Sequence, residues 1–378
     1  MGVPVAPVRF SDDYRLHLLM TDNTERFDRA SELARSGETE SAAALYRDIL
    51  TSQPKHLAAA KALAEIVEAG RAAGDAGAAR KTVTDIETAS TYSVGRTALV
   101  HGRFDVAIRC YTKILDMDPD YDDAIWGLAE AHYGNRDLKE ALKWYRTYSE
   151  KYPDDPEARH MVAALGDGPK PVRASDAYVR ETFDHFAEDF DKQLLEDLEY
   201  RAPALIHALF REVSPDSATD LHILDAGCGT GLSGIDFRPY AASLVGVDLS
   251  PEMLKLAKAR DLYDDLHEGE LAAYMRANPG RFDLIVAADV FCYIGDLAES
   301  LEAAFVTLKT GGLMIFSVEA QSTRGYSLTG SGRYAHKPAY VRKAAQSAGF
   351  KEITGRTDTL RTEYGEPVKG YLTALTKI

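Results

Sequence analysis

The chain has 378 residues, of which 45% are apolar and 27% charged, an ordinary globular composition with room for two domains. Its 44 basic and 59 acidic residues give a formal charge of −15, so the surface repels phosphate backbones and nucleic acid is not an expected partner. No apolar run approaches the roughly 20 residues that span a bilayer, and residues 1–10 lack the pattern of a secretion signal. The three cysteines lie far apart, so neither a disulfide framework nor a metal site is expected. These features predict a soluble cytoplasmic protein without membrane contact.

A repeat with a period of 34 residues marks the first part of the chain. The stretch VAIRCYTKILDMDP, which starts at Val106, is followed one period later by EALKWYRTYSEKYP, with alanine, tyrosine and proline in the same places. Ala42, Tyr46 and Pro54 repeat this internal spacing, whereas residues 57–87 are alanine-rich and lack the proline. We expect about four helix pairs over residues 24–153, then a closing helix over 157–165.

This period and these positions resemble tetratricopeptide repeats rather than a helical bundle with chance spacing. The resemblance implies a concave groove that binds a protein or peptide partner and carries no chemistry itself. The following segment, GDGPKPVRAS, has the composition of a linker. The sequence therefore predicts an all-α repeat domain over residues 1–165, a linker over 166–175 and a second domain over 176–378.

Short apolar runs alternate with helical patterns in the second domain. The runs are LHILDA, SLVGVD, FDLIVAAD and GGLMIFSVE, and this alternation predicts an α/β domain with parallel strands and helices on both faces. The last two runs, residues 350–357 and 369–377, have only a loop between them, so they should pair as an antiparallel hairpin.

Three alternate glycines follow the first apolar run, in the stretch Ile223 to Leu232, which reads ILDAGCGTGL. Gly227, Gly229 and Gly231 allow positive φ angles and a close approach of the backbone to a ligand. Ligands of doubly wound sheets bind outside the carboxyl ends of the strands, where this loop would lie. The glycines also satisfy a dinucleotide fingerprint, but the closing hairpin replaces the second nucleotide-binding half that a dinucleotide needs.

The ordered set LDAGCGTG, VGVDLSPEML, FDLIVAADV and LKTGGLMIFSVE resembles the class I S-adenosylmethionine-dependent methyltransferases. The resemblance covers residues 172–378 and implies a Rossmann-like seven-stranded sheet whose last strand is antiparallel, with S-adenosylmethionine as the cofactor. It further implies that Asp225, Gly227, Cys228 and Gly229 hold the methionine part. Asp289 would border the methyl group, and Cys228 has no catalytic role.

The resemblance also places the nucleoside part of the cofactor. Asp248 would accept hydrogen bonds from both ribose hydroxyls, because a carboxylate is an acceptor-only group. Leu249 and Met253 would pack on the faces of adenine. Glu270 would take the adenine amino group, and the backbone amide of Leu271 would face a ring nitrogen.

Candidates for the acceptor side come from three segments around the expected methyl position. Phe183, Phe186 and Phe190 recur at helical spacing, and the resemblance suggests a lid here, with Tyr178 or Phe186 near the cofactor. Tyr293 lies after the fourth strand. The polar loop after the fifth strand offers a further set of side chains, namely Glu319, Arg324, Tyr326, Arg333, Tyr334 and His336. His336 is the preferred general base and Tyr293 a second catalytic candidate, although a solvated loop histidine is the commoner outcome.

Three functions remain open at this point. In the first, an aromatic lid closes over a small-molecule methyl acceptor and the repeats dock a partner. In the second, the repeat groove recruits a protein or carrier-bound substrate. In the third, the chain is a non-catalytic repeat scaffold, against which the intact glycines and the two acids at the strand ends count.

Overall fold

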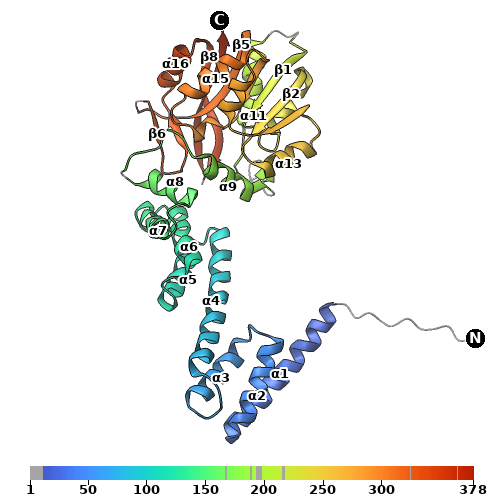
Figure 1. Cartoon of the computed structure of the whole chain (residues 1–378), viewed down its shortest axis with the longest axis vertical. Helices are drawn as coiled ribbons and strands as arrows, with labels where there is room; N and C mark the ends of the chain where they lie inside the picture. Colours follow the sequence, from blue (N-terminus) through green and yellow to red (C-terminus); the bar gives the residue numbers. More distant parts are fainter. Residues whose placement is uncertain are drawn as a thin grey trace, which may run out of the picture. The chain divides into compact units, whose positions relative to one another are not determined.

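The structure, a computed structural model, describes residues 12–166, 168–187, 190–192, 198–214, 218–323, 325–363 and 365–378. The side chains of 12–22, 186 and 192 lie outside this description. The chain forms two compact units, Met1–Trp144 and Tyr145–Ile378. Figure 1 shows helices alone in the first of them and a sheet with helices in the second. No helix in the described ranges combines the length and the apolar character that crossing a membrane requires.

The N-terminal unit is a series of helices, each packed on the next. Their bounds are α1 (Asp12–Ser36), α2 (Thr39–Ser52), α3 (Leu57–Glu68), α4 (Ala76–Val100), α5 (Phe104–Met117), α6 (Asp122–Gly134) and the first half of α7 (Leu138–Lys151). The small and aromatic positions of the repeat are both interior: Ala107 is fully buried and Tyr111 is 1% exposed. A Cβ at Gly127 would lie 2.5 Å from the Tyr111 ring, so these helices meet at small residues.

One part of the predicted helix pattern is wrong. Residues 76–100 form a single helix of 25 residues, where the expected pairing requires a break. The stretch contains no proline, and the small Gly95 packs against Tyr111 without interrupting the helix. The missing proline that marks this repeat as degenerate is thus the reason why α4 runs on.

In the residues that the structure describes, the C-terminal unit is built on a sheet of nine strands in the order β3-β2-β1-β4-β5, with β5 then bordered by β9 and beyond it β8. The bounds are β1 (Leu221–Ala226), β2 (Ala241–Asp248), β3 (Asp265–Glu268), β4 (Phe282–Ala287), β5 (Leu308–Ala320), β6 (Tyr326–Leu328), β7 (Tyr334–His336), β8 (Phe350–Glu363) and β9 (Glu366–Lys377). β9 runs antiparallel to both β5 and β8, which confirms the predicted hairpin and the antiparallel last strand.

Two short strands extend the seven-stranded arrangement that the sequence predicts. β6 and β7 form an antiparallel hairpin, and β7 pairs in parallel with the end of β5 through Glu319 and Ala320. The segment expected to be a polar loop is therefore partly sheet, and it holds His336 inside a strand.

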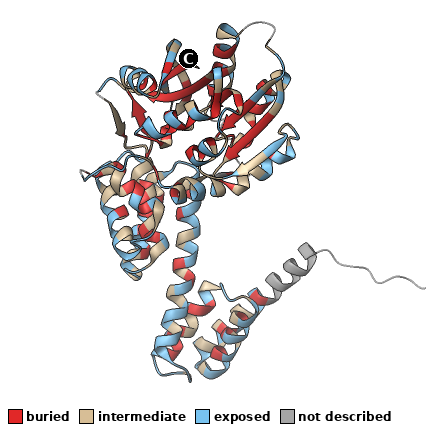
Figure 2. Cartoon of the chain, turned by 45° about the horizontal axis from the view of Figure 1, so that its top comes forward, coloured by how far each residue is buried: buried red, intermediate tan, exposed pale blue. Residues whose placement is uncertain are grey.

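Helices cover both faces of this sheet. In the described residues, the helices that follow α7 are α8 (Pro156–Leu165), α9 (Asp176–Phe186), α10 (Phe190–Lys192), α11 (Ala202–Val213), α12 (Leu232–Phe237), α13 (Pro251–Ala259), α14 (Leu271–Ala277), α15 (Ala298–Thr307) and α16 (Pro338–Ser347), with 3-10 turns η3 (Arg238–Tyr240) and η4 (Phe291–Tyr293). Adjacent strand residues serve opposite cores: Leu224 packs in the core with α14, α15 and α16, and Ile223 packs in the core with α11. Figure 2 shows the buried residues gathered along the sheet.

Candidate functional site

The turn from β1 into α12 is a tight glycine loop. Gly227, Gly229 and Gly231 all have positive φ, at 69°, 53° and 91°. The amides of Gly227 and Cys228 donate to the Val247 carbonyl on β2, at 2.8 and 3.1 Å. A Cβ at Gly229 would have only Phe190 within 4 Å, so this glycine faces open space. The backbone is therefore fixed to the neighbouring strand and presents a face without side chains.

A cavity of about 300 Å³ lies at this loop and at the ends of β2 and β4. Ten of the predicted site residues line it, namely Gly227, Cys228, Gly229, Asp248, Leu249, Met253, Glu270, Leu271, Asp289 and Tyr293. They come from segments far apart in sequence, which the parallel strands bring to one edge of the sheet. These predicted residues thus make up part of the lining of one cavity.

Asp248, at the end of β2, is held by backbone amides. Its Oδ2 accepts a hydrogen bond from Gly229 N at 2.8 Å, and its Oδ1 accepts one from Ser250 N at 2.9 Å. Burial raises the pKa of this carboxyl above its ordinary value, although the two amides oppose that shift. A carboxylate has about four acceptor positions, so Asp248 keeps capacity to accept from a diol in the cavity.

Residues 194–354 match the family model of a methyltransferase domain. Tetratricopeptide repeat models match residues 27–87 and 98–165. The C-terminal unit carries a methyltransferase domain. Its sheet order, its glycine loop and the acid at the end of β2 are those of S-adenosylmethionine-dependent methyltransferases, and tetratricopeptide repeats precede it.

Known proteins resemble the methyltransferase domain over part of its length. The ubiquinone biosynthesis O-methyltransferase of Colwellia psychrerythraea is 30% identical over 113 residues, 29% of this chain and 46% of that protein. The enzyme of the same name from Thiobacillus denitrificans is 29% identical over 157 residues, 36% of this chain and 67% of that protein. The chain thus spans about half to two thirds of the length of these relatives.

Among solved structures, the 1,6-didemethyltoxoflavin-N1-methyltransferase of Burkholderia thailandensis, with bound 1,6-didemethyltoxoflavin and S-adenosylhomocysteine, is 18% identical. The match has a TM-score of 0.45 and covers 56% of this chain and 93% of that one.

Glu270 differs in one respect from the expectation that it binds the adenine amino group. Its carboxylate caps α14 by accepting from the amides of Ala272 and Ala273, at 3.0 and 2.7 Å. Glu270 nevertheless lines the cavity beside Gly269, where a Cβ would meet nothing within 4 Å. Its role toward the adenine amino group stays a prediction, because both carboxylate oxygens already accept hydrogen bonds from amides of α14.

Asp225 corrects the predicted contact with the methionine part. The side chain is 1% exposed, lies outside the cavity lining and accepts a hydrogen bond from the Tyr263 hydroxyl at 2.6 Å. Burial raises the pKa of Asp225 to about 7. Gly231 is likewise outside the lining, as the N-cap of α12. Both residues therefore support the glycine loop on the side away from the cavity.

The raised pKa of Asp225 predicts a pH-dependent stability. Because the native carboxyl keeps its proton up to about pH 7 while the unfolded one releases it near pH 4, this group makes folding less favourable as pH rises through that window. An Asp225→Asn variant lacks this term, so its unfolding free energy relative to the wild type should increase from about pH 4 to pH 7 and then level off. Urea unfolding of both proteins across that range measures the difference, and a pH-independent difference contradicts the prediction.

His336 is not a base facing the cavity. The imidazole is fully buried in β7, outside the lining, and its Nε2 donates to the Gly295 carbonyl at 3.0 Å. Burial lowers its pKa to about 4. Pairing of β7 with β5 turns the ring inward, which a polar loop would not do.

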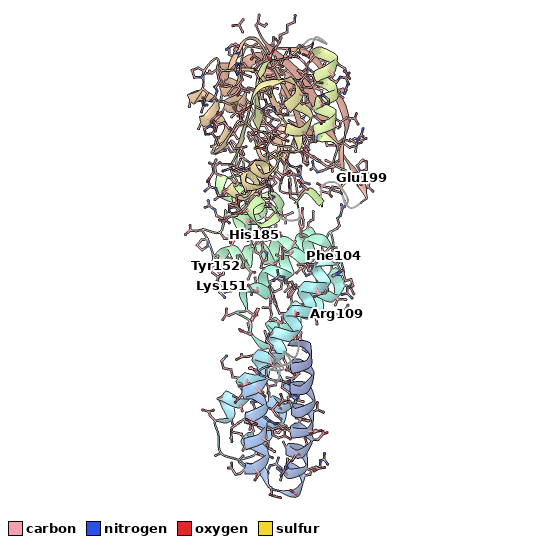
Figure 3. All side chains as sticks on the ribbon, turned by 90° about the vertical axis from the view of Figure 1, so that its right-hand side faces the viewer. Phe104, Arg109, Lys151, Tyr152, His185 and Glu199 are labelled. Atoms are coloured by element: carbon pink, nitrogen blue, oxygen red, sulfur yellow. The ribbon has the colours of Figure 1, made fainter. Side chains whose placement is uncertain are left out.

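The predicted lid is only partly where the sequence places it. Tyr178 is buried outside the cavity lining and stacks on His160, and the side chain of Phe186 and Arg324 lie outside the described residues. Phe183 does line the cavity, whereas His185, two residues further along α9, is exposed (Figure 3). Phe183 packs edge-to-face on the ring of Tyr293, at 5.5 Å between centroids. The aromatic face of α9 therefore forms a wall of the cavity through Phe183.

A buried network of charges joins three residues that the sequence offered as candidates, Asp289, Glu319 and Arg333, to two that it did not, Arg361 and Glu363. Arg361 on β8, only 4% exposed, contacts Asp289 and Glu319 and donates from Nε to Glu363 at 2.6 Å. Arg333 binds the same Glu319 at 2.7 Å and also contacts Glu363. Two guanidinium groups and three carboxylates give the cluster a formal charge of −1.

Asp289 joins this network to the cavity. It has a positive φ of 59°, and its amide donates to Ser317 Oγ at 3.0 Å. Its Oδ2 contacts Arg361, whereas its Oδ1 is buried and has no hydrogen-bond partner in the described part of the chain. Asp289 thus combines a fixed position with an unused acceptor atom.

Proposed function

We propose that this chain transfers a methyl group from S-adenosylmethionine to a hydroxyl group of a small, neutral, aromatic molecule. The observation that carries the proposal is a cavity that is lined both by the glycine loop and Asp248 and by aromatic side chains. The curated relatives named above are O-methyltransferases, which supports a hydroxyl as the acceptor.

The residues at one end of the cavity fit the cofactor. Gly229 leaves space beside the backbone, and Asp248 keeps acceptor capacity for the ribose hydroxyls. Leu249 and Met253 give apolar surface for adenine, with methionine adapting easily to a flat ring. These residues would bind and orient S-adenosylmethionine.

The other end of the cavity favours an aromatic acceptor without negative charge. Phe183, Tyr200 and Tyr293 line the cavity, and aromatic side chains bind flat rings by stacked and edge-to-face contacts. All three types of nitrogen in the Arg361 guanidinium are already engaged with carboxylates. With a net negative network beside it, this region offers little attraction to a carboxylate or phosphate group of a substrate.

The cofactor, when bound, supplies a methyl group already activated on a sulfonium, so the protein mainly aligns the acceptor and excludes water. Burial raises the pKa values of Tyr293 and Tyr200 well above their ordinary range, so both hydroxyls keep their protons and can orient an acceptor. Asp289 lines the cavity and is held in place by Arg361, and we assign this residue to the neighbourhood of the acceptor hydroxyl.

The tetratricopeptide repeats, in this proposal, dock a protein or peptide partner and do not present the substrate. The alternative is a protein or carrier-bound acceptor recruited by the repeats, as repeat arrays offer extended binding surfaces. The cavity favours the small molecule because its acceptor end is made of aromatic and buried charged side chains.

One experiment separates the two versions. The full chain is incubated with methyl-labelled S-adenosylmethionine and a cell lysate, which is then divided into small-molecule and macromolecular fractions. We expect label in small molecules, bound through a base-stable ether as O-methylation of an aromatic hydroxyl requires. Label confined to protein would support the alternative, and no transfer above a heat-inactivated control would refute catalysis.

A further inference from the structure

The last helix matched by the repeat models, α8, packs within the same compact unit as the methyltransferase domain. Its Ala164 shares a buried cluster with Leu328 and Tyr334 of the β6–β7 hairpin. The Tyr334 hydroxyl also donates to the Pro171 carbonyl at 2.8 Å, which ties the hairpin to the segment after α8. The hairpin inserted after β5 is therefore supported by a helix of the repeat type.

His160 is the polar centre of this contact. The side chain is 5% exposed, and its Nε2 donates to the Gly332 carbonyl at 2.7 Å, so Nε2 carries the ring proton. Its ring stacks on Tyr178 of α9, with 4.0 Å between centroids and 16° between planes. A buried hydrogen bond and a parallel stack together fix the imidazole in one orientation.

Gly332 is shaped for this contact. Its φ is +76°, and an added Cβ would lie 3.2 Å from the Tyr178 hydroxyl and 3.3 Å from Met161 Sδ. A side chain is thus disfavoured both by the backbone conformation and by the surrounding atoms. The α8 helix therefore approaches this turn closely enough for His160 to form a hydrogen bond with the backbone.

Both partners of His160 continue into walls of the cavity. Gly332 directly precedes Arg333, which lines the cavity and binds Glu319 and Glu363. Tyr178 belongs to α9, whose Phe183 lines the cavity one turn further on. The cofactor residues Asp248 and Gly229 lie on other elements and hold each other by a hydrogen bond, and Asp184 of α9 accepts a hydrogen bond from Ser250 Oγ, two residues after Asp248.

We propose that His160 is a positioning residue for acceptor binding. Its hydrogen bond fixes the Gly332–Arg333 backbone, and its ring fixes α9, so the charged and the aromatic walls of the acceptor end keep their spacing. This inference rests on the proposed function, because it assigns an acceptor end to the cavity. It makes a helix of the repeat type part of the substrate-binding machinery.

Two substitutions separate the hydrogen bond from the stacking. His160→Phe keeps an aromatic ring on Tyr178 and loses the donor, whereas His160→Gln places an amide near Nε2 and loses the ring. The probe is the small-molecule fraction that the wild type labels from S-adenosylmethionine. For His160→Phe we expect an apparent KM for that fraction about three- to tenfold higher, the value of one hydrogen bond, and a smaller rise for His160→Gln.

Two further measurements separate a positioning role from a general loss of structure, which would also weaken cofactor binding and speed up exchange throughout the unit. Calorimetry should give the same Kd for S-adenosylhomocysteine in all three proteins, within about twofold. Amide hydrogen exchange over residues 329–336 should become faster in His160→Phe and recover in His160→Gln.

His207→Phe is the matched control. His207 is also a partly buried histidine of this unit, bonded to the Tyr240 hydroxyl at 3.2 Å and packed on Phe237, but it lies outside the cavity lining. An unchanged KM in His160→Phe, or an equal rise in His207→Phe, overturns the positioning role. If the wild type binds S-adenosylhomocysteine but labels no small molecule, the proposed function fails first, and the inference falls with it.

Discussion

Replacing Asp248 with asparagine should weaken the binding of S-adenosylhomocysteine by about 100-fold or more. The carboxylate sits at the end of β2, fixed by the amides of Gly229 and Ser250, with acceptor capacity left for two ribose hydroxyls. Hydrogen bonds to a charged acceptor are each worth about 1.5–3 kcal/mol, and 1.4 kcal/mol corresponds to a factor of ten. Asparagine also has one acceptor oxygen in place of two, so at most one of these contacts survives. Isothermal titration calorimetry measures the loss.

Asp265→Asn is the control for that experiment. Asp265 is an exposed acid at the start of β3, where it contacts His267, and it does not line the cavity. The substitution removes the same charge from the neighbouring strand and should leave the Kd unchanged. Equal affinities of the wild type and Asp248→Asn would remove Asp248 from the cofactor site.

Replacing Arg361 with methionine should destabilise the fold by about 3–5 kcal/mol, because removing one partner of a buried ion pair leaves uncompensated charge. Arg361 is 4% exposed and contacts Asp289, Glu319 and Glu363. In the variant, Glu319 and Glu363 would keep their contacts with Arg333, whereas Asp289 would lose its ion pair. The two arginines also hold the pKa of Glu363 below its ordinary value against the opposing effect of burial. Urea unfolding at neutral pH gives the change in free energy.

A control on the same strand distinguishes burial from charge. Arg356 on β8 pairs with Glu212, whose side chain is 53% exposed, and Arg356→Met should cost less than about 1 kcal/mol, as for surface ion pairs. The deficit of Arg361→Met should also shrink as pH falls through the range in which its carboxylate partners take up protons, since neutral acids need no cation. A pH-independent loss, or equal losses in the two variants, contradicts the assignment.

The part of the site that could be predicted consists of residues whose position depends only on their near neighbours in the sequence. The positive φ of Gly227 and Gly229 needs glycine at those positions, so the loop is legible from the residue types alone. Asp248 follows an apolar run directly, and the end of a parallel strand fixes which edge of the sheet it reaches. The repeat spacing likewise gave helices with alanine and tyrosine buried at the predicted places.

The charged network could not be predicted because it depends on register between distant segments. Arg361 and Asp289 are 72 positions apart. The pairing of β8 with β9 shifts register between Thr359 and Arg361, and as a result both Leu360 and Arg361 are buried in a strand that otherwise alternates. Strict alternation would place one of these two neighbours outside.

The prediction that His336 is a general base was wrong for a related reason. Glycines and polar residues around it indicate a loop, but the segment pairs with the extended end of β5, which reaches Ala320. Once it is in a strand, the ring is directed into the interior. Residue type suggested a base, whereas strand pairing decided what the ring could reach.

The position of α8 has a consequence for how such chains can change. The segment that the repeat models recognise ends at residue 165, but the compact unit of the methyltransferase domain begins at Tyr145. Removing everything before the linker would strip away α8 and uncover Tyr334, Leu328 and the ring of Tyr178. We therefore expect that repeats upstream of α7 can be removed or exchanged without exposing the core of the methyltransferase domain. The final helix, α8, cannot be removed in this way because it packs on that domain.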